Sequence, residues 1–190
     1  MALDEETGPP PPGRTPFDTL FCALLPRLYR RAVMLSGARQ SAEDAVHETY
    51  LKLVAGPERL LAHPEPYAYA FAALLSAVRD ARRKEIRQVP TEDPGAAQAH
   101  GWDGGLARRQ SEWEALRLLS RLSARQAGVV ILVDLDGYTI DQAAKIMKVH
   151  RGTAARHRAR ALEKLRTLAA EGQDAREGRN IRDGERHEQA

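Results

Sequence analysis

The sequence predicts an all-α protein with two small helical domains joined by a flexible linker, the second carrying a helix-turn-helix. Apolar residues recur at three- and four-residue spacing in several segments, and strand-like alternation is almost absent. Between these segments, "VPTEDPGAAQAHGWDGGLARRQ" at 89 to 110 holds prolines and glycines without periodicity, which is typical of a linker. A chain of 190 residues that is 43% hydrophobic and 29% charged accommodates two such modules.

The two ends of the chain predict mobile tails. Residues 1 to 15 are acidic and rich in proline, and residues 171 to 190 contain almost no apolar side chains. The beginning lacks the basic and apolar pattern of a signal peptide, and no apolar stretch approaches membrane-spanning length. The single cysteine, Cys22, cannot form an internal disulfide. We therefore expect a soluble, cytoplasmic protein with no membrane partner, no cofactor and no metal site.

The first domain, residues 16 to 88, is predicted to contain three helices. The first ends near the "SG" dipeptide, and Pro26 inside it leaves open a kink or a split into two helices. The second begins at Ser41, which forms a capping-box pattern with Asp44, and ends before the "GP" dipeptide. The third begins around "PEPY", and its expected core face consists of Tyr67, Phe71, Leu74, Leu75 and Val78.

The second domain, residues 111 to 170, is predicted to contain four short helices. Capping patterns start three of them, pairing Ser111 with Glu114, Ser123 with Gln126 and Thr139 with Gln142. The β-branched run "VVILV" at 129 to 133 resembles a strand, but the cap before it favours a buried helix. The fourth helix is the basic stretch "VHRGTAARHRARALEKLR" at 149 to 166.

The last two helices form a helix-turn-helix pattern, because only "KVHRGT" separates them. The positions expected to pack inside are Ile140, Ala143, Ala144, Ile146 and Met147 on one helix and Ala154, Ala161, Leu165 and Leu168 on the other. The basic side chains then point outward, where they suit guanine edges and phosphates. A basic, solvated helix in an ordinary bundle is the alternative. The near absence of acids, with Glu163 alone among them, favours DNA binding.

Two segments carry a family resemblance. "SAEDAVHETYLKL" resembles "DAEDLVQETFLRA", and the segment from Leu122 to Arg166 follows a second family pattern nearly throughout, with matches at Arg125, Gln126, Gly137, Ala143, Ala144, Gly152 and Thr153. Over residues 17 to 168 the chain resembles the small extracytoplasmic-function sigma factors of bacterial RNA polymerase. In that family the first segment grips the clamp helices of the polymerase large subunit. The resemblance implies a core-polymerase contact through Asp44, Val46, His47, Glu48 and Leu51.

The resemblance also implies two DNA-contact sets. For the minus-thirty-five element the set is His150, Arg151, Thr153, Ala154, Arg156, His157, Arg158 and Arg160. For the minus-ten element it is Tyr69, Arg79, Arg82, Arg83 and Lys84. Tyr69 lies off the apolar face of its helix, which makes it the candidate for stacking on an unpaired base. The cluster "RDARRK" is also consistent with cations that only complement a helix C-terminus.

The third helix departs from the family pattern. Ala70, Ala73 and Leu74 stand where family members commonly have Arg, Arg and Asn. Fewer donors remain for an unpaired strand, so we expect weak promoter opening. In the basic helix, Arg156, His157 and Arg158 also differ from the common residues, so the family's minus-thirty-five preference does not transfer.

The function implied by the resemblance is promoter selection for core RNA polymerase, with double-stranded promoter DNA as the second partner. An anti-sigma factor that masks the DNA-binding faces is left open. The alternative is a stand-alone helix-turn-helix regulator whose first domain is a protein-interaction module. The sequence does not favour an enzyme, because its six histidines form no ligand spacing and no nucleophile stands beside a base in a readable motif.

Overall fold

The computed structural model describes residues 14 to 88 and 116 to 187, with side chains up to residues 85 and 171 of these ranges. Within them all regular structure is helical, as predicted. The predicted arm up to residue 13, the linker from 89 to 110, the cap at Ser111 and the last three residues lie outside the described part. The elements are α1 (Pro16–Ser36), α2 (Arg39–Val54), α3 (Pro57–Leu61), α4 (Pro66–Gln88), a helix at 116 to 120, α6 (Ala124–Val130), η1 (Ile131–Leu135), α7 (Ile140–Ile146) and α8 (Arg151–His187).

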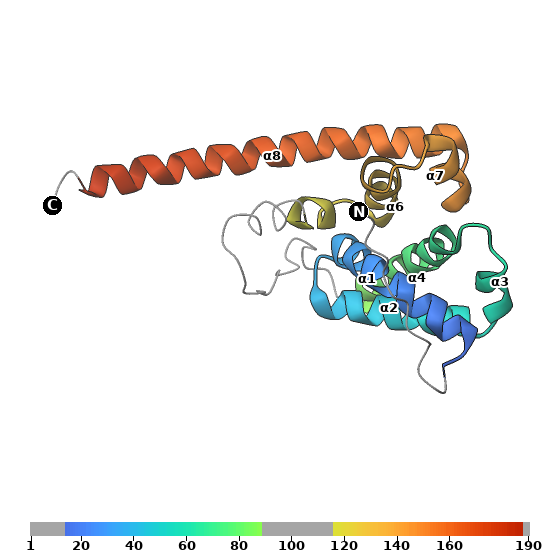
Figure 1. Cartoon of the computed structure of the whole chain (residues 1–190). Coiled ribbons are helices and arrows are strands. Elements are labelled where there is room, and N and C mark those ends of the chain that lie inside the picture. Colours follow the sequence, from blue (N-terminus) through green and yellow to red (C-terminus); the bar gives the residue numbers. More distant parts are fainter. Residues whose placement is uncertain (1–13, 89–115, 188–190) are drawn as a thin grey trace, which may run out of the picture.

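The first domain packs α1, α2 and α4 around one core, with α3 as a short connection (Figure 1). The capping box at the start of α1 is complete, because the Thr15 hydroxyl accepts from the Asp18 backbone and the Asp18 carboxylate accepts from the Thr15 backbone. All five residues predicted for the core face of α4 are buried, among them Phe71 and Leu74 at 0% exposure. The period of apolar residues was therefore sufficient to orient α4.

Three local predictions in this domain need correction. Pro26 does not split α1, since its ring lies on the exposed side of a continuous helix. The predicted capping box at Ser41 is wrong, because α2 begins at Arg39 and its N-cap residue makes no side-chain hydrogen bond. The "GP" dipeptide ends α2 but also begins α3, with Pro57 in the first turn, where a missing N–H costs nothing.

The second domain follows its capping patterns closely. Ser123 and Thr139 both form complete capping boxes, with Gln126 and Gln142 as their partners. The "VVILV" run is helical and continues into the π-helical turn η1, whose end is closed by the bond from the Asp136 amide to the Ile131 carbonyl, at 2.9 Å. Gly137 follows with φ of 77°, a conformation in which glycine carries no steric cost.

Helix α8 is longer than predicted. The sequence predicted a disordered tail from residue 171, whereas the helix continues to His187 and extends past the rest of the molecule (Figure 1). Segment 171 to 187 contains no proline, so each backbone amide can continue the hydrogen-bonding pattern without a hydrophobic core. The expectation of a disordered tail rested only on the small number of apolar residues in this segment.

The two domains are in contact, an arrangement the sequence did not predict. Helix α6 packs against both α1 and α4, and α7 also packs against α4. The approach is close at Gly128 of α6, where an added Cβ would lie 3.0 Å from both methyl carbons of Leu75. A single hydrophobic cluster consequently contains buried residues of both domains.

Candidate nucleic-acid and protein interfaces

The N-terminus of α8 is fixed by His150. Its Nδ1 accepts from the Gly152 amide at 3.1 Å, and its carbonyl accepts from the amides of Thr153 and Ala154 at 2.9 and 3.0 Å. The turn before it contains Lys148 at φ of 54°, and the Val149 amide bonds back to the Ala144 carbonyl of α7 at 3.0 Å. These contacts set a tight turn between α7 and α8, so the predicted helix-turn-helix is present.

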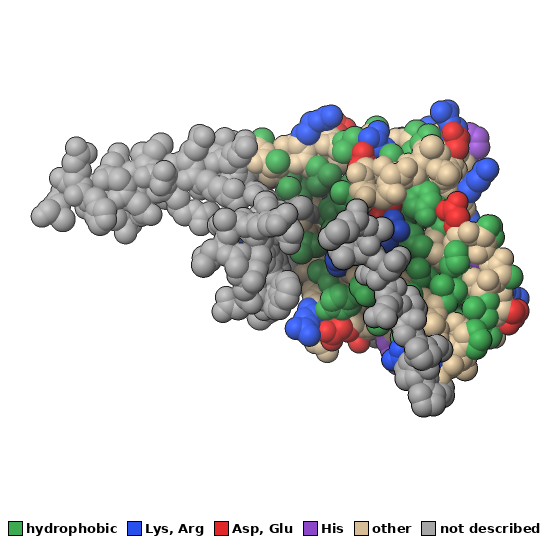
Figure 2. All heavy atoms as spheres, in the orientation of Figure 1, with side chains coloured by type: hydrophobic (Ala, Val, Ile, Leu, Met, Phe, Trp, Pro, Cys, Tyr) green, Lys and Arg blue, Asp and Glu red, His purple; other side chains and the backbone are tan. Residues whose placement is uncertain are grey.

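The outward face of α8 is basic. Arg156 and Arg160 are exposed and one helical turn apart, whereas Ala154 and Ala161 are buried on the opposite side. Figure 2 shows Lys and Arg side chains along the described part of α8, with hydrophobic side chains beneath it. Ala154 was predicted as a DNA contact, but its side chain is 0% exposed and seats the helix instead.

Two predicted DNA contacts of α8 have acidic partners within the second domain. Arg158 makes two bonds to the Asp134 carboxylate, at 3.0 and 2.5 Å, and lies on the side of α8 that faces η1. Arg151 pairs with Asp141 at 2.9 Å in an exposed position. Such exposed pairs are weak, so phosphate could replace the carboxylate of Asp141 at little cost. For Arg158 the bidentate geometry makes that exchange less favourable.

His157 of α8 is partly buried, and three arginines influence its ionisation. Burial, and then the charges of Arg125, Arg160 and Arg156, lower the pKa of His157 below its ordinary value. The imidazole is therefore neutral at neutral pH in the free protein. An anion placed against this face would reverse part of that shift.

The predicted minus-ten residues on α4 have different surroundings. Arg83 and Lys84 are exposed, and Arg79 is half-buried. Arg82 points inward and donates to the carbonyls of Leu122 at 2.9 Å, Ser120 at 3.4 Å and Leu35. Its partners at Ser120 and Leu122 belong to the second domain, so Arg82 connects the two domains in this structure.

Tyr69 lies in a cleft between the domains. Its ring centroid is 5.1 Å from that of His63. The cleft has a volume of about 270 Å³ and is lined from the second domain by residues of α7, including Gln142, Lys145 and Ile146. A base could stack on Tyr69 only from the side that α7 leaves open.

Burial changes the interpretation of the atypical residues of α4. Ala70 and Leu74 are both 0% exposed, whereas Ala73 is partly exposed. A polar side chain at Leu74 would be buried in the core, so the structure does not support Leu74 as a lost DNA contact. Ala73 remains the one position of the three where a longer polar side chain could reach solvent.

The predicted polymerase contact on α2 is largely exposed. Asp44, His47 and Glu48 face solvent, and Leu51 is 47% exposed. Val46 is only 9% exposed, so it packs in the domain core and is not available to a partner.

Sequence reasoning missed two exposed apolar residues of the first domain. Val54, near the end of α2, is 40% exposed, and Leu61 of α3, a helix that the sequence did not predict, is 43% exposed. Leu51 and Val54 are three residues apart on α2 and so share one face of that helix. The result is a surface that combines carboxylates with exposed aliphatic side chains.

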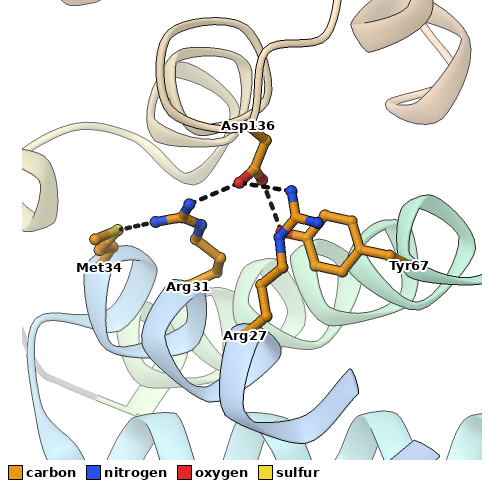
Figure 3. A network of polar contacts seen from close by, with 5 residues as sticks. All are labelled: Arg27, Arg31, Met34, Tyr67 and Asp136. Atoms are coloured by element: carbon orange, nitrogen blue, oxygen red, sulfur yellow. Dashed lines mark hydrogen bonds and ion pairs between the residues drawn. The ribbon is translucent and has the colours of Figure 1, made fainter. Parts of the chain in front are cut away.

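A buried polar network was also missed (Figure 3). The Asp136 carboxylate accepts from Arg31 at 2.6 Å and from the Tyr67 hydroxyl at 2.7 Å, and it pairs with Arg27 at 3.0 Å. Its side chain is 1% exposed. Burial alone would raise the pKa of Asp136, but the bonds from Tyr67, Arg31 and Arg27 outweigh it and hold the pKa below its ordinary value.

The described residues offer no metal centre, since no group of three or more His, Cys, Asp or Glu side chains gathers there. None of the helices in the same ranges has the length and apolarity needed to cross a bilayer.

Comparisons with known proteins match both domains. The family model of sigma-70 region 2 matches residues 20–88, and that of sigma-70 region 4 matches residues 113–165. The ECF RNA polymerase sigma factor EcfG of Rhodopseudomonas palustris is 30% identical over 146 residues, which cover 77% of this chain and 81% of EcfG. SigM of Mycobacterium tuberculosis, another ECF RNA polymerase sigma factor, is 28% identical over 157 residues, covering 82% of this chain and 78% of SigM.

A solved structure shares the same architecture. It contains the sigma factor RpoE in complex with the anti-sigma factor NepR from Bartonella quintana. The similarity has a TM-score of 0.61 at 26% identity, and it covers 81% of this chain and 96% of the other. Both halves of the chain, in the same order, thus correspond to one family.

Proposed function

Because this chain belongs to the extracytoplasmic-function sigma factors of the sigma-70 family, which direct core RNA polymerase to promoters, we propose how its surfaces divide that task. The second domain reads the minus-thirty-five element with α8. The first domain contacts the minus-ten region with α4 and core polymerase with α2. The observation that carries this assignment is the helix-turn-helix with Arg156 and Arg160 exposed opposite the buried Ala154 and Ala161.

On α8, the proposed base-reading residues are those near its N-terminus and on its outward face. Arg156 and Arg160 are unobstructed, and Thr153 is half-exposed one turn earlier. Arg can bond two acceptors on a guanine edge, or it can neutralise a phosphate. His150 and Arg151 are proposed to contact backbone phosphates at the start of the helix, where the helix dipole also favours anions. Arg158 joins them only if its pair with Asp134 opens.

On α4, Arg83 and Lys84 are proposed to hold phosphates beside the minus-ten element, and Arg79 is proposed to assist them. Their support is exposure together with positive charge at positions 79, 83 and 84, within about two turns of the helix. Tyr69 is proposed to stack on an unpaired base from the open side of its cleft. Ala73 leaves this surface short of one donor, which supports the proposal that promoter opening is weak.

On α2, the contact with core polymerase is proposed to consist of Asp44, His47, Glu48 and Leu51, extended by Val54. Exposed aliphatic residues beside carboxylates suit a partner helix that is apolar along its centre and basic at its edges. Val46 supports this surface from beneath.

We further propose three properties that follow from the family. Since sigma factors are initiation factors, this chain is proposed to carry no catalytic residues of its own. A cytoplasmic location is proposed because polymerase and DNA are there. An anti-sigma partner is proposed because the structural relative RpoE is described in complex with one.

The stand-alone regulator loses its main argument. Its support was that Ala73 and Leu74 replace an Arg and an Asn expected to contact DNA, but Leu74 is a core position. One changed surface position does not turn a polymerase-binding domain into another module.

The test is promoter binding by holoenzyme assembled from the full-length chain and core polymerase. Arg160→Ala should weaken binding to a cognate promoter by about fivefold to about a hundredfold, since one bidentate contact carries about 1 to 3 kcal/mol. Arg30→Ala, which removes the same charge from an exposed position on α1, is the control. Equal affinity of the Arg160 variant and the control would reject α8 as the reading helix.

A further inference from the structure

We propose that the cleft between α4 and α7 binds a free guanine nucleotide. Residues of both domains line this cleft, and its volume is about 270 Å³. Small-molecule sites usually measure about 300 to 1,000 Å³, so the cleft suits a ligand no larger than a mononucleotide. The inference goes beyond the proposed function, because the nucleotide binds in the absence of polymerase and promoter DNA.

One wall of the cleft is an aromatic surface at the start of α4. Residues at spacings of three and four line it from one side of the helix, namely Glu65, Ala68, Tyr69 and Ala72. The Tyr69 ring is supported by His63, whose ring centroid lies 5.1 Å away with the planes inclined by 32°. His63 is held in turn, since its Nδ1 accepts from the Glu65 amide at 3.0 Å. A planar base can therefore stack on a ring that is already in position.

The charges along the cleft have opposite signs at its two ends. Lys145 and Lys148 are exposed at the C-terminal end of α7. Glu65 lies near the other end, beside Tyr138: burial raises the pKa of that tyrosine, and the charge of the Glu65 carboxylate raises it further. Helix α7 itself is about 10 Å long, because its seven residues each rise about 1.5 Å. The cleft thus has a cationic end and an anionic end.

This polarity matches a nucleotide, whose phosphate and base lie on opposite sides of the sugar. Lys145 and Lys148 suit the phosphate, because an ammonium group contacts it as a point charge. Gln142 lies between the two ends, and its carbonyl oxygen accepts from the Thr139 amide at 2.8 Å and from the Thr139 hydroxyl at 3.0 Å. Its NH2 group can still donate to an acceptor of the sugar or the base.

The anionic end favours guanine over adenine. Guanine presents two neighbouring donors, N1–H and the N2 amino group, which together fit the two oxygens of one carboxylate. Glu65 is exposed, and a carboxylate has about four acceptor sites, so the nearby Tyr138 hydroxyl does not exhaust it. Adenine has a lone pair at N1 instead of a donor, and that lone pair would face the carboxylate unfavourably.

A free nucleotide fits this cleft better than a strand of promoter DNA does. An unpaired promoter base could stack on the same Tyr69 ring, since both ligands combine a base with phosphate. A strand, however, continues through a phosphate on either side of each base, whereas the cleft has cations at one end and a carboxylate at the other. The charges therefore match a ligand with a single phosphate end.

The test measures nucleotide binding to the full-length chain by isothermal titration calorimetry, without polymerase or DNA. Guanosine monophosphate should bind at one site per chain. Adenosine monophosphate should bind roughly tenfold more weakly, as expected for loss of one hydrogen bond to a charged group. Guanosine, which lacks the phosphate, and inorganic phosphate, which lacks the base, should each bind more weakly than the nucleotide. Absence of saturable binding, or binding no tighter than that of phosphate alone, would overturn the proposal.

Substitutions assign the binding to the cleft. Tyr69→Leu should weaken binding of guanosine monophosphate by about fivefold to about a hundredfold, the range for loss of one base–aromatic stack. Lys145→Gln should weaken binding of the nucleotide and leave binding of guanosine unchanged. Lys52→Gln is the matched control, because it removes the same charge from an exposed position on α2. If circular dichroism shows all variants folded and all bind as the control does, the ligand lies elsewhere and the proposal is wrong.

A further variant tests the base preference without disturbing the packing. Glu65→Gln changes an exposed side chain and removes the charge that two guanine donors require. It should weaken binding of guanosine monophosphate and leave that of adenosine monophosphate nearly unchanged, so that the two affinities converge. An unchanged preference for guanine would show that Glu65 does not contact the base.

A single-stranded oligonucleotide with the minus-ten sequence separates this proposal from the proposed function of α4. If the oligonucleotide binds in a Tyr69-dependent way but guanosine monophosphate does not bind, the nucleotide site is rejected and the role of Tyr69 at the promoter stands. If the nucleotide binds but the oligonucleotide does not, even with core polymerase, the nucleotide site stands and the promoter role of Tyr69 is rejected.

Discussion

Substitution at position 74 of α4 should lower the stability of the protein strongly, whereas substitution at the neighbouring position 73 should change it little. Leu74 is 0% exposed, and Leu74→Asn would remove a buried aliphatic side chain and bury an amide in its place. Loss of the apolar burial costs about 1.5 to 3 kcal/mol, and an amide without partners costs about 1 to 3 kcal/mol more. The expected fall in the free energy of unfolding is therefore about 3 to 5 kcal/mol, a large part of a typical total of about 5 to 15 kcal/mol.

Chemical and thermal denaturation followed by circular dichroism measure this cost. At about 2 to 4 °C per kcal/mol for a chain of this size, Leu74→Asn should lower the Tm by roughly 6 to 20 °C. Ala73→Arg, at a partly exposed position, should change the stability by less than about 0.5 kcal/mol. If Leu74→Asn left the Tm unchanged, the packing of α4 described above would be wrong.

The same pair of positions tests promoter opening. Transcription from duplex promoters is compared with transcription from promoters that carry a pre-melted bubble over the minus-ten region. The bubble should help the wild-type protein strongly, and Ala73→Arg alone should narrow that gap, because the new donor can contact the freed strand. Efficient opening of ordinary duplex promoters by the wild type would refute the idea that Ala73 limits opening.

Three further outcomes are expected. The slope of log affinity for duplex DNA against log salt concentration should fall by about one unit in Arg160→Ala if that side chain contacts phosphate. The slope should fall by less in Arg158→Ala, because the Arg158 guanidinium is already paired with Asp134. Equal slopes for the two variants would contradict this difference between the two arginines. Phosphates should raise the pKa of His157, which burial and neighbouring arginines depress, so binding should strengthen as the pH falls from about 7.5 to about 6, and His157→Gln should lose that dependence. Reversing the charges of Asp44 and Glu48 together should weaken co-purification with core polymerase while circular dichroism is unchanged, and full retention of core would count against the α2 surface.

Local patterns in the sequence predicted most of the secondary structure. The capping boxes at Ser123 and Thr139 and the core face of α4 follow from residues within one or two helical turns of each other. The helix-turn-helix was found for the same reason. Where competing local rules applied, as at Ser41 and Pro57, the prediction failed: a serine near a helix start is not always its cap, and a proline can begin a helix as well as end one.

Contacts between the domains could not be predicted from the sequence. Asp136 and Arg31 are separated by 105 positions, and no pattern connects them. Arg82 stands in a basic cluster whose composition indicates DNA binding, yet its partners are backbone carbonyls that have no sequence signal. Charge in a sequence indicates what a side chain can bind, whereas only the packing of the helices decides which partner it has in a given state.

The most direct test of the central claim is transcription by purified core polymerase on fragments of the source genome, with and without this chain. A sigma factor predicts transcripts that begin at defined positions only when the chain is added, and that share sequence elements about ten and thirty-five base pairs upstream of those positions. If the transcripts began at the same sites with and without the chain, the assignment would be contradicted. It would also be contradicted if the chain bound DNA but no new transcript appeared.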